Sequence, residues 1–217
     1  GIPTMSSQGD MMQSKWGCHG DHEIIALAPA SVQEMFNLTV DAFNLAETYR
    51  VPTFIMAEET VAHMRDRITV REPPCFVRRN MPRRDIVSSK TKNDVMNDVD
   101  VPPMLPFGQG LRVNVTGLSH DENAYPTIQG EEHVKLVTRL CEKIRKRVDI
   151  IVRTEEKFID DAEIVVISYG IPARAALKAV KDARKEGIKA GYLRLITVWP
   201  FPEKIIEQVS RKADTTI

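Results

Sequence analysis

Near the start of the chain, a cysteine, two histidines and an aspartate lie within the segment CHGDH, which spans residues 18–22. Thiolates, imidazoles and carboxylates are the side chains that bind zinc, and a zinc site needs roughly three or four of them to converge. No second pair of histidines or cysteines elsewhere in the sequence completes such a set. A metal site is therefore the least favoured interpretation of this segment.

Two other interpretations of CHGDH remain open. An unperturbed imidazole titrates at about pH 6.5, so His19 or His22 could serve as a charge or proton partner for an anionic substrate. The favoured interpretation is structural. Gly17 and Gly20 shape a loop, and Asp21 or His22 hydrogen-bonds the backbone at the entrance to a strand or at a subunit contact.

A run of short polar side chains precedes this loop and includes Thr4, Ser7, Gln8 and Asp10. In a loop, such groups can line a pocket and meet the carboxylate of a substrate. They can equally hold a turn, with Ser7 and Asp10 capping a helix that begins near Met11. The sequence favours neither role over the other.

The composition restricts the class of protein. The 217 residues carry 30 basic and 30 acidic side chains, so no basic excess indicates a nucleic-acid partner. No apolar run reaches the roughly 20 residues that span a bilayer. The three cysteines form no CxxC pair, which argues against an iron–sulfur cluster or a structural zinc bound by this chain alone. We expect free thiols and a cytoplasmic protein.

Local signals predict a strand–helix–strand unit in the first quarter of the chain. Residues 24–28 (IIALA) and 53–57 (TFIMA) are short apolar runs typical of buried strands. Between them, Ser31 and Glu34 have the spacing of a capping box, and apolar side chains recur at helical steps as far as Arg50. Such a unit is the building block of a parallel sheet.

Prolines interrupt residues 71–110, which predicts a long connection between two domains. A basic cluster lies within it and consists of Arg78, Arg79, Arg83 and Arg84. These side chains could bind a phosphate or an acidic partner. A solvated linker or a subunit contact is the favoured interpretation, because charge blocks usually face solvent or an interface.

Strands and helices alternate again after this connection. We expect a strand at 112–118, a helix at 131–147, strands at 163–168 and 192–198, and a further helix from Ile205. Gly170 and Pro172 predict a turn followed by the first residue of a helix, which Gly187 ends. The sequence thus predicts an α/β protein with domains at residues 1–70 and 112–217, joined by a linker at 71–111.

Three further features have two interpretations each. Glu58 and Glu59 follow a strand, where the active-site groups of α/β proteins gather, but the start of a helix explains them as well and is favoured. Residues 120–122 (HDE) are favoured as part of a turn over a cation site. Trp199 is expected to pack between the last strand and the last helix.

Several segments resemble one family when they are read in order. They are GIPTMSSQGDMMQ and GDHEIIALAPASVQEMFNLTVDAFNLAETYRVPTFIMAEE, then VNVTGLSHDENAYP, DDAEIVVISYGIPARAALKAVKDARKEGIKAGYLRLITVWPFPEKII and KADTTI. Their order and spacing resemble the alpha subunits of 2-oxoacid:ferredoxin oxidoreductases, most of all the 2-oxoglutarate branch, also called 2-oxoglutarate synthase. The resemblance implies part of the pyrimidine-binding domain of thiamine diphosphate enzymes, followed by a transketolase C-terminal-like α/β domain. It also implies a segment of a longer subunit, truncated at both ends.

For function, the resemblance implies the oxidative decarboxylation of 2-oxoglutarate to succinyl-CoA with electrons passed to ferredoxin, a reversible reaction. Pyruvate or branched-chain 2-oxoacids are alternative substrates, and a non-catalytic assembly module of the same fold is an alternative role. The family's substrate-binding threonine and arginine, and the glutamate that contacts the aminopyrimidine ring, would precede Gly1. Within this chain, the substrate-pocket candidates are Thr4, Gln8, Asp10, His19 and His22.

The resemblance also implies cofactors and partners. Thiamine diphosphate with magnesium would lie at the interface with a beta subunit, because this chain has no GDG motif for the diphosphate. Iron–sulfur clusters and coenzyme A would be held by other subunits or domains, so this chain alone would bind no cofactor. We expect a hetero-oligomer with two-fold symmetry. Its partners would be the beta subunit, gamma and delta iron–sulfur subunits and ferredoxin, without nucleic acid or membrane.

Overall fold

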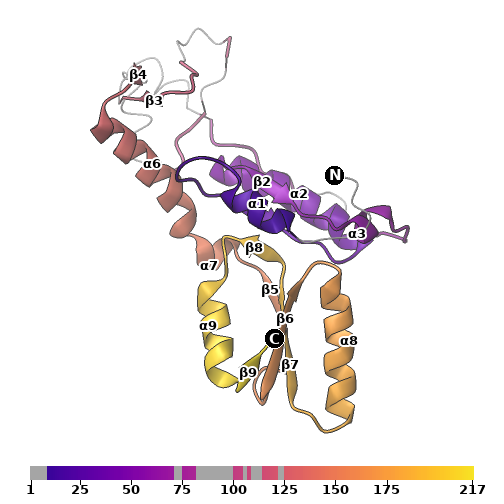
Figure 1. Cartoon of the computed structure of the whole chain (residues 1–217). Helices are drawn as coiled ribbons and strands as arrows, with labels where there is room; N and C mark the ends of the chain where they lie inside the picture. Colours follow the sequence, from indigo (N-terminus) through magenta and orange to yellow (C-terminus); the bar gives the residue numbers. More distant parts are fainter. Residues whose placement is uncertain (1–8, 71–74, 82–99, 105–106, 109–113, 122–124) are drawn as a thin grey trace.

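Two α/β parts make up the chain, one above the other in Figure 1. The computed structural model describes residues 9–70, 75–81, 100–104, 107–108, 114–121 and 125–217. The upper part contains a small sheet with its helices, and the lower part contains a second sheet with a helix on each side. The α/β class predicted from the sequence is confirmed.

The first sheet has three strands in the order β2–β1–β8. The central strand β1 (Ile25–Leu27) pairs in parallel with β2 (Thr53–Ile55) and antiparallel with β8 (Thr197–Trp199). Helix α2 (Val32–Tyr49) connects β1 to β2, as the sequence predicts. The third strand comes from the last part of the chain, which the sequence assigns to a different domain.

Half of the capping box predicted at the start of α2 is present, because the Glu34 carboxylate accepts from the N–H of Ala30 in place of that of Ser31. Ser31 is the N-cap, and its hydroxyl oxygen accepts a hydrogen bond from the backbone N–H of Glu34 at 3.2 Å. This bond satisfies one of the donors that have no partner within the helix. The Glu34 carboxylate reaches back to the backbone N–H of Ala30 at 2.8 Å and so holds the incoming chain against the helix.

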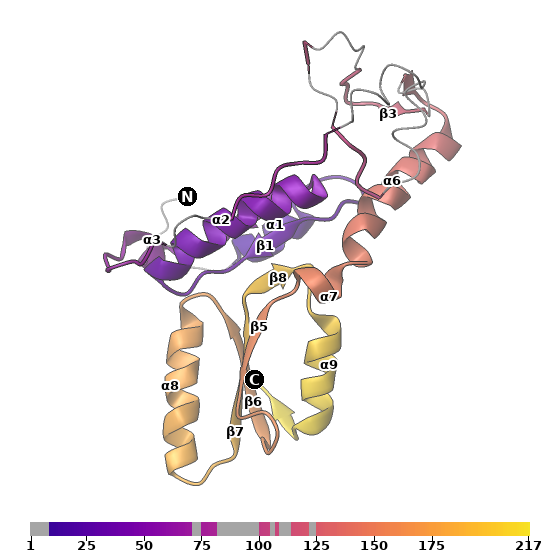
Figure 2. The same ribbon diagram turned by 180° about the vertical axis from the view of Figure 1, so that it is seen from behind.

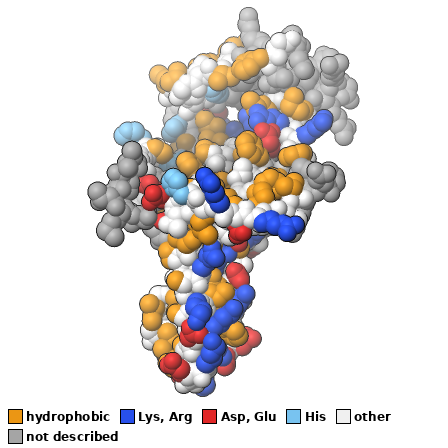
Figure 3. Space-filling view, turned by 90° about the vertical axis from the view of Figure 1, so that its right-hand side faces the viewer, with side chains coloured by type: hydrophobic (Ala, Val, Ile, Leu, Met, Phe, Trp, Pro, Cys, Tyr) orange, Lys and Arg blue, Asp and Glu red, His pale blue; other side chains and the backbone are white. Residues whose placement is uncertain are grey.

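The second sheet has four strands in the order β5–β7–β6–β9. Strand β6 (Ile164–Tyr169) pairs in parallel with β7 (Ala190–Leu195) and β9 (Thr215–Thr216), and β5 (Thr154–Lys157) runs antiparallel to β7. Helices α8 (Pro172–Lys185) and α9 (Glu203–Lys212) cover its two faces (Figures 1 and 2). Seen from the side of α8, this part forms the narrow lower end of the molecule, where charged side chains gather (Figure 3).

The chain passes from one sheet to the other between β7 and β8. Only Ile196 separates these two strands, and its carbonyl accepts a hydrogen bond from the Ala28 N–H at 2.8 Å. Buried apolar side chains from both sheets form one cluster, which includes Ala26, Val165 and Leu193. The two sheets therefore share a core at this seam, by which we mean the contact between β1 and the β7–β8 connection.

A buried ion pair crosses the seam. The Arg194 side chain is 6% exposed and donates to the Glu34 carboxylate through both of its terminal nitrogens. A carboxylate oxygen of Glu155 lies 3.5 Å from the same guanidinium. Burial by itself raises the pKa of Glu34, but hydrogen bonds from Arg194 and from the Ala30 N–H outweigh it, so that the pKa of Glu34 is lowered.

Helix α6 (Gly130–Arg145) lies beside one end of α2 in both ribbon views and leads into the short helix α7 (Val148–Ile151). Its residue Ile144 is fully buried in a cluster with Ile25, Leu27 and Tyr49. The sequence places this helix in the second domain, whereas it packs against the first sheet. The domain boundaries themselves stay predictions.

At its outer end, α6 contacts a hairpin of β3 (Ser119–His120) and β4 (Pro126–Thr127). The strand predicted at 112–118 is wrong for residues 114–118, which form no strand, and residues 112–113 lie outside the described residues. The turn predicted around residues 120–122 is supported by reciprocal bonds between Asp121 and Tyr125 at 2.9 Å. Glu122 lies outside the described residues.

Two described pieces of the 71–111 connection, residues 75–81 and 100–104, contact α2 or its C-cap. Asn44 holds the chain by donating to the Cys75 carbonyl and accepting from the Val77 N–H, each at 2.8 Å. Arg79 forms two 2.5 Å hydrogen bonds to the Glu47 carboxylate, so this member of the basic cluster already has an anionic partner. Residues 83 and 84 lie outside the described residues. None of the described helices is long and apolar enough to cross a membrane.

We expect Glu34→Gln to lower the free energy of unfolding by about 3 kcal/mol at pH 7, because it leaves the buried Arg194 guanidinium without its main carboxylate partner. The pKa of Glu34 is lowered in the folded state, so its contribution is present above the ordinary value of 4.5 and is lost as the pH falls through the folded-state pKa. Urea unfolding at pH 7 and at pH 3.5 measures both effects.

The matched control is Lys189→Gln, which removes an exposed pair with Glu163. We expect little change in its unfolding midpoint, because solvent screens exposed pairs. A Glu34→Gln protein as stable as the parent at pH 7, or equally destabilised at both pH values, would contradict the role of this ion pair.

Candidate functional site

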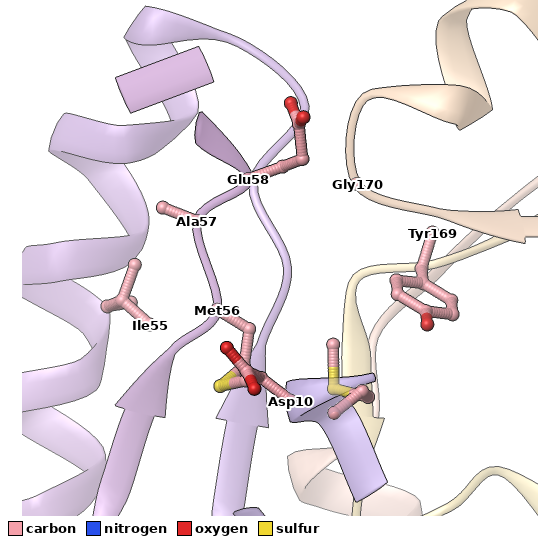
Figure 4. A pocket seen from close by; sticks show the side chains of 8 residues that line it. Asp10, Ile55, Met56, Ala57, Glu58, Tyr169 and Gly170 are labelled. Atoms are coloured by element: carbon pink, nitrogen blue, oxygen red, sulfur yellow. The ribbon is translucent and has the colours of Figure 1, made fainter. Parts of the chain in front are cut away.

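A cavity of about 240 Å³ lies where the ends of β2 and β6, which belong to different sheets, face the first turn of α1 (Asp10–Trp16) (Figure 4). Residues that follow β2, the end of β6 and the start of α1 line it. They are Asp10, Met11, Ile55, Met56, Ala57, Glu58, Tyr169 and Gly170. The carboxyl ends of parallel strands are the usual place for binding sites in α/β proteins, which makes this cavity the candidate site.

Three polar side chains give the cavity its chemistry. The Asp10 carboxylate belongs to the first turn of α1, and the Glu58 carboxylate is directed toward the start of the next helix (Figure 4). Burial raises the pKa of Tyr169, so its hydroxyl is a neutral hydrogen-bond donor at physiological pH. Two acids and one neutral hydroxyl suit a ligand that offers hydrogen-bond donors better than one that brings further negative charge.

Glu58 has a structural role in addition to its place in the cavity. It is the N-cap of α3 (Glu59–His63), and its carboxylate accepts from the Thr60 N–H at 3.0 Å and from the Thr60 hydroxyl at 3.2 Å. Glu59 is the first residue of the helix. The helix start that the sequence favours for these two acids is confirmed.

The five sequence-predicted pocket residues do not meet at one place. Asp10 lines the cavity, whereas Thr4 and Gln8 lie outside the described residues. The N-cap of α1 is Gly9, so the prediction that Asp10 caps this helix is wrong, because Asp10 is its first helical residue. His19 and His22 follow the other end of α1, about 10 Å away by the rise of a seven-residue helix, and do not line the cavity.

The loop that holds CHGDH is closed by its own side chains. The Cys18 sulfur lies 3.2 Å from Nε2 of His22, and Nδ1 of His22 lies 3.4 Å from the Gly20 carbonyl oxygen. Gly20 has a φ of 76°, which favours glycine. Among the described residues, no three His, Cys, Asp or Glu side chains gather in a way that could hold a metal ion. The contacts match the structural interpretation of the loop.

A buried carboxylate fixes the chain after this loop. The Glu23 side chain is 9% exposed and accepts from the Lys15 ammonium at 2.6 Å and from the Arg145 guanidinium at 2.8 Å. The Lys15 ammonium also donates to the His22 carbonyl at 2.7 Å. These bonds tie the end of α1, the start of β1 and α6 together.

Trp199 holds the other side of α1. Its indole N–H donates to the Met11 carbonyl at 2.8 Å, and its ring meets Trp16 edge-on with 6.3 Å between the ring centres. Phe201 lies 6.0 Å away, measured in the same way. Trp199 also packs against a core cluster that includes Val209 of α9, in line with the predicted packing against the last helix, and it contacts α1 in addition.

The sequence missed Met56, Ala57, Tyr169 and Gly170 as lining residues. Each of them lies at or just after the carboxyl end of a strand that the sequence does predict, so the position relative to the strand end was an available signal. What the sequence could not provide is the proximity of the two strand ends, because they belong to different sheets.

We expect Trp199→Phe to loosen α1 while leaving β6 intact. The change keeps an aromatic ring but removes the indole hydrogen bond to the Met11 carbonyl, which still accepts from the Ser14 hydroxyl, so the cost is about 1 kcal/mol. Hydrogen exchange of the α1 amides should accelerate roughly tenfold, with no change in β6. The matched control is Trp16→Phe, since this ring is 66% exposed. Unchanged exchange in α1 of Trp199→Phe would refute this anchoring role.

Two family models match the chain. Residues 1–139 match the model described as "Pyruvate flavodoxin/ferredoxin oxidoreductase, thiamine diP-bdg". Residues 162–217 match "Pyruvate:ferredoxin oxidoreductase core domain II". The first match contains β1, β2 and most of α6, and the second contains α8 and α9.

Curated relatives are similar along almost the whole chain. It is 47% identical to the 2-oxoglutarate synthase subunit KorA of Methanocaldococcus jannaschii, with 98% of this chain and 57% of that subunit covered. It is 49% identical to the subunit of the same name of Methanothermobacter marburgensis, with 98% and 56% covered. The chain therefore spans a little over half the length of these relatives.

A solved structure has the same fold. The 2-oxoglutarate:ferredoxin oxidoreductase from Magnetococcus marinus, with 2-oxoglutarate, coenzyme A and succinyl-CoA bound, matches with a TM-score of 0.84 at 21% identity. The match covers 100% of this chain and 38% of that chain.

Proposed function

This chain belongs to the pyruvate flavodoxin/ferredoxin oxidoreductase family, and from this premise we propose that it is part of the alpha subunit of a 2-oxoglutarate:ferredoxin oxidoreductase. The observation that carries the proposal is the identity of 47% and 49% to subunits named 2-oxoglutarate synthase KorA, over 98% of the chain. The fold shared with the Magnetococcus marinus enzyme supports it.

The proposed reaction consumes 2-oxoglutarate and coenzyme A. The bond between the carboxylate and the oxo carbon breaks, CO2 leaves, and the succinyl group forms a thioester with coenzyme A. Two electrons pass to ferredoxin, and one proton is released. Bound thiamine diphosphate would supply the carbanion chemistry of this step.

The described residues do not fit the diphosphate end of that cofactor. The acids in the cavity, Asp10 and Glu58, would repel phosphate oxygens, and no three metal-binding side chains gather among the described residues. We therefore assign the diphosphate and magnesium to a beta subunit that meets this chain. Iron–sulfur clusters and the coenzyme A site are assigned to further subunits or domains of a hetero-oligomer with two-fold symmetry, which reduces ferredoxin in the cytoplasm.

For the substrate pocket, we retain Asp10, which lines the cavity, together with the sequence-predicted candidates Thr4 and Gln8. The polar side chains of Thr4 and Gln8 can donate hydrogen bonds to a substrate carboxylate. Asp10 cannot do so as a carboxylate and would instead position neighbouring donors. His19 and His22 are separated from Asp10 by the length of α1, which argues against direct contact with the same substrate.

We expect the full-length subunit, co-expressed with its beta subunit, to reduce a low-potential dye with 2-oxoglutarate and coenzyme A. The value of kcat/KM for 2-oxoglutarate should exceed those for 2-oxoisovalerate and pyruvate by at least about 100-fold, because a site built for a second carboxylate leaves its donors unpaired with the shorter or apolar acids. Higher activity with either competitor would refute the substrate assignment. Inactivity with all three acids would refute the proposal that this chain is part of an enzyme. The alternative role, a non-catalytic assembly module of the same fold, would then be favoured.

Variants of the pocket candidates test the site. We expect Gln8→Ala to raise KM for 2-oxoglutarate about tenfold with little change in kcat, since it removes a hydrogen bond to a charged group. Under the same assay, His22→Asn should leave KM within about twofold of the parent value. A large KM increase for His22→Asn and none for Gln8→Ala would reverse the assignment.

A further inference from the structure

Three basic side chains meet where the end of α2 lies beside α6. Arg50 is the C-cap of α2, and Arg139 and Lys143 are one turn apart on the same face of α6. Figures 1 and 2 both show α6 passing this end of α2. We call Arg50, Arg139 and Lys143 the basic triad.

The triad is partly removed from solvent. Lys143 is 5% exposed, and its ammonium donates to the Arg50 carbonyl at 2.7 Å. The Arg50 guanidinium donates to the Pro102 carbonyl at 2.7 Å. Arg50 and Arg139 are of intermediate exposure. The charged groups of Lys143 and Arg50 are thus held in place by backbone carbonyls.

Among the described residues, no carboxylate forms an ion pair with any member of the triad. The nearby acids are engaged elsewhere, since Asp100 pairs with Arg147 at 2.9 Å and Glu47 pairs with Arg79 at 2.5 Å. Carbonyl oxygens satisfy two of the three side chains as hydrogen-bond acceptors but do not neutralise their charge. Lysine and arginine side chains buried to this extent are normally paired, because an uncompensated buried charge is costly.

The positive charges of Arg50 and Arg139 repel that of Lys143, and this repulsion affects the pKa of Lys143. Burial, followed by the charges of Arg50 and Arg139, lowers the pKa of Lys143 to about 8. The Cys141 thiol, whose own pKa burial raises, is the other titratable group that acts on it. Burial also lowers the pKa values of Arg50 and Arg139, and the charge of Asp100, which pairs with Arg147, offsets this effect only in part at Arg139.

We propose that the basic triad of Arg50, Arg139 and Lys143 binds an oxyanion, either the phosphate or sulfate type of a soluble ligand or a carboxylate of a partner subunit. Two guanidinium groups and one ammonium present planar and point-like donors together, which is the set that oxyanions prefer in proteins. Bound charge would compensate the three cations at once. This site lies on α6 and the end of α2 and shares no lining residue with the cavity at Asp10.

A purely structural role for Lys143 is the competing explanation. Its bond to the Arg50 carbonyl caps the end of α2, where a cation is favoured by the helix dipole. That role does not need Arg139, which makes Arg139 the residue to change. Arg139→Gln keeps the length and the helix propensity of the side chain but removes its charge, and Arg139→Lys keeps the charge.

The experiment titrates sulfate into the assembled complex of full-length subunits by calorimetry, since the charge of sulfate stays constant between pH 7 and pH 9. If the ligand is a soluble oxyanion, sulfate should bind at pH 7. It should bind more weakly at pH 9, because Lys143 loses its proton between these pH values. It also predicts at least about tenfold weaker binding for Arg139→Gln, with partial rescue by Arg139→Lys. Lys204→Gln, which alters an exposed pair with Asp149, is the matched control and should bind as the parent does.

If the triad instead binds a carboxylate of a partner subunit, the expected results of the same experiments differ. The assembled complex then binds no sulfate, and Arg139→Gln weakens subunit association in sedimentation experiments, whereas Lys204→Gln does not. If Arg139→Gln changes neither sulfate binding nor association, the proposal is overturned. Sulfate binding that is equal in the parent and in Arg139→Gln would show an adventitious ion only and overturns it as well. Neither readout uses enzyme activity, so this test is independent of the proposed function.

Discussion

The pairing of β8 with β1 is the interaction on which the rest of the structure depends. It joins a strand from the end of the chain to the centre of the first sheet, one residue after the chain has left the second sheet. Main-chain hydrogen bonds, a shared apolar core and the Arg194–Glu34 pair act at the same place. Because Arg194 is buried, the pair is stable only while both sheets remain in contact, so the seam behaves as one unit.

The candidate site follows from this seam. Helix α1 has seven residues, which is too short to be stable by itself in water, and it depends on contacts at both ends. Trp199 from β8 holds its start through the Met11 carbonyl, and Lys15 holds its end through Glu23. The cavity between Asp10 and Tyr169 therefore exists only because strand ends of different sheets are brought together.

The distribution of charge separates two regions with different chemistry. The cavity presents the acids Asp10 and Glu58, which do not attract a dicarboxylate, so under the proposed function the recognition of 2-oxoglutarate would rely on groups beyond these two. The basic triad carries the opposite charge and lies on α6 near the end of α2. The net charge of zero, from 30 basic and 30 acidic side chains, therefore does not reflect the local charge of these two regions.

Local signals in the sequence determined the elements. The Ser31–Glu34 spacing starts α2, apolar runs form β1, β2 and β6, and Pro172 begins α8, because capping, burial and a fixed φ act within a few residues. The family resemblance was likewise readable from the order of segments. Only the tertiary structure decided that β8 joins the first sheet, that α6 packs on it, and that β5, a charged TEEK segment, pairs with β7. It also decided that His19 and His22 lie away from the cavity. These outcomes depend on which apolar faces and strand edges cover one another across sequence separations from 35 residues, between Lys157 and Tyr192, to 188 residues, between Met11 and Trp199, and no local pattern encodes that choice.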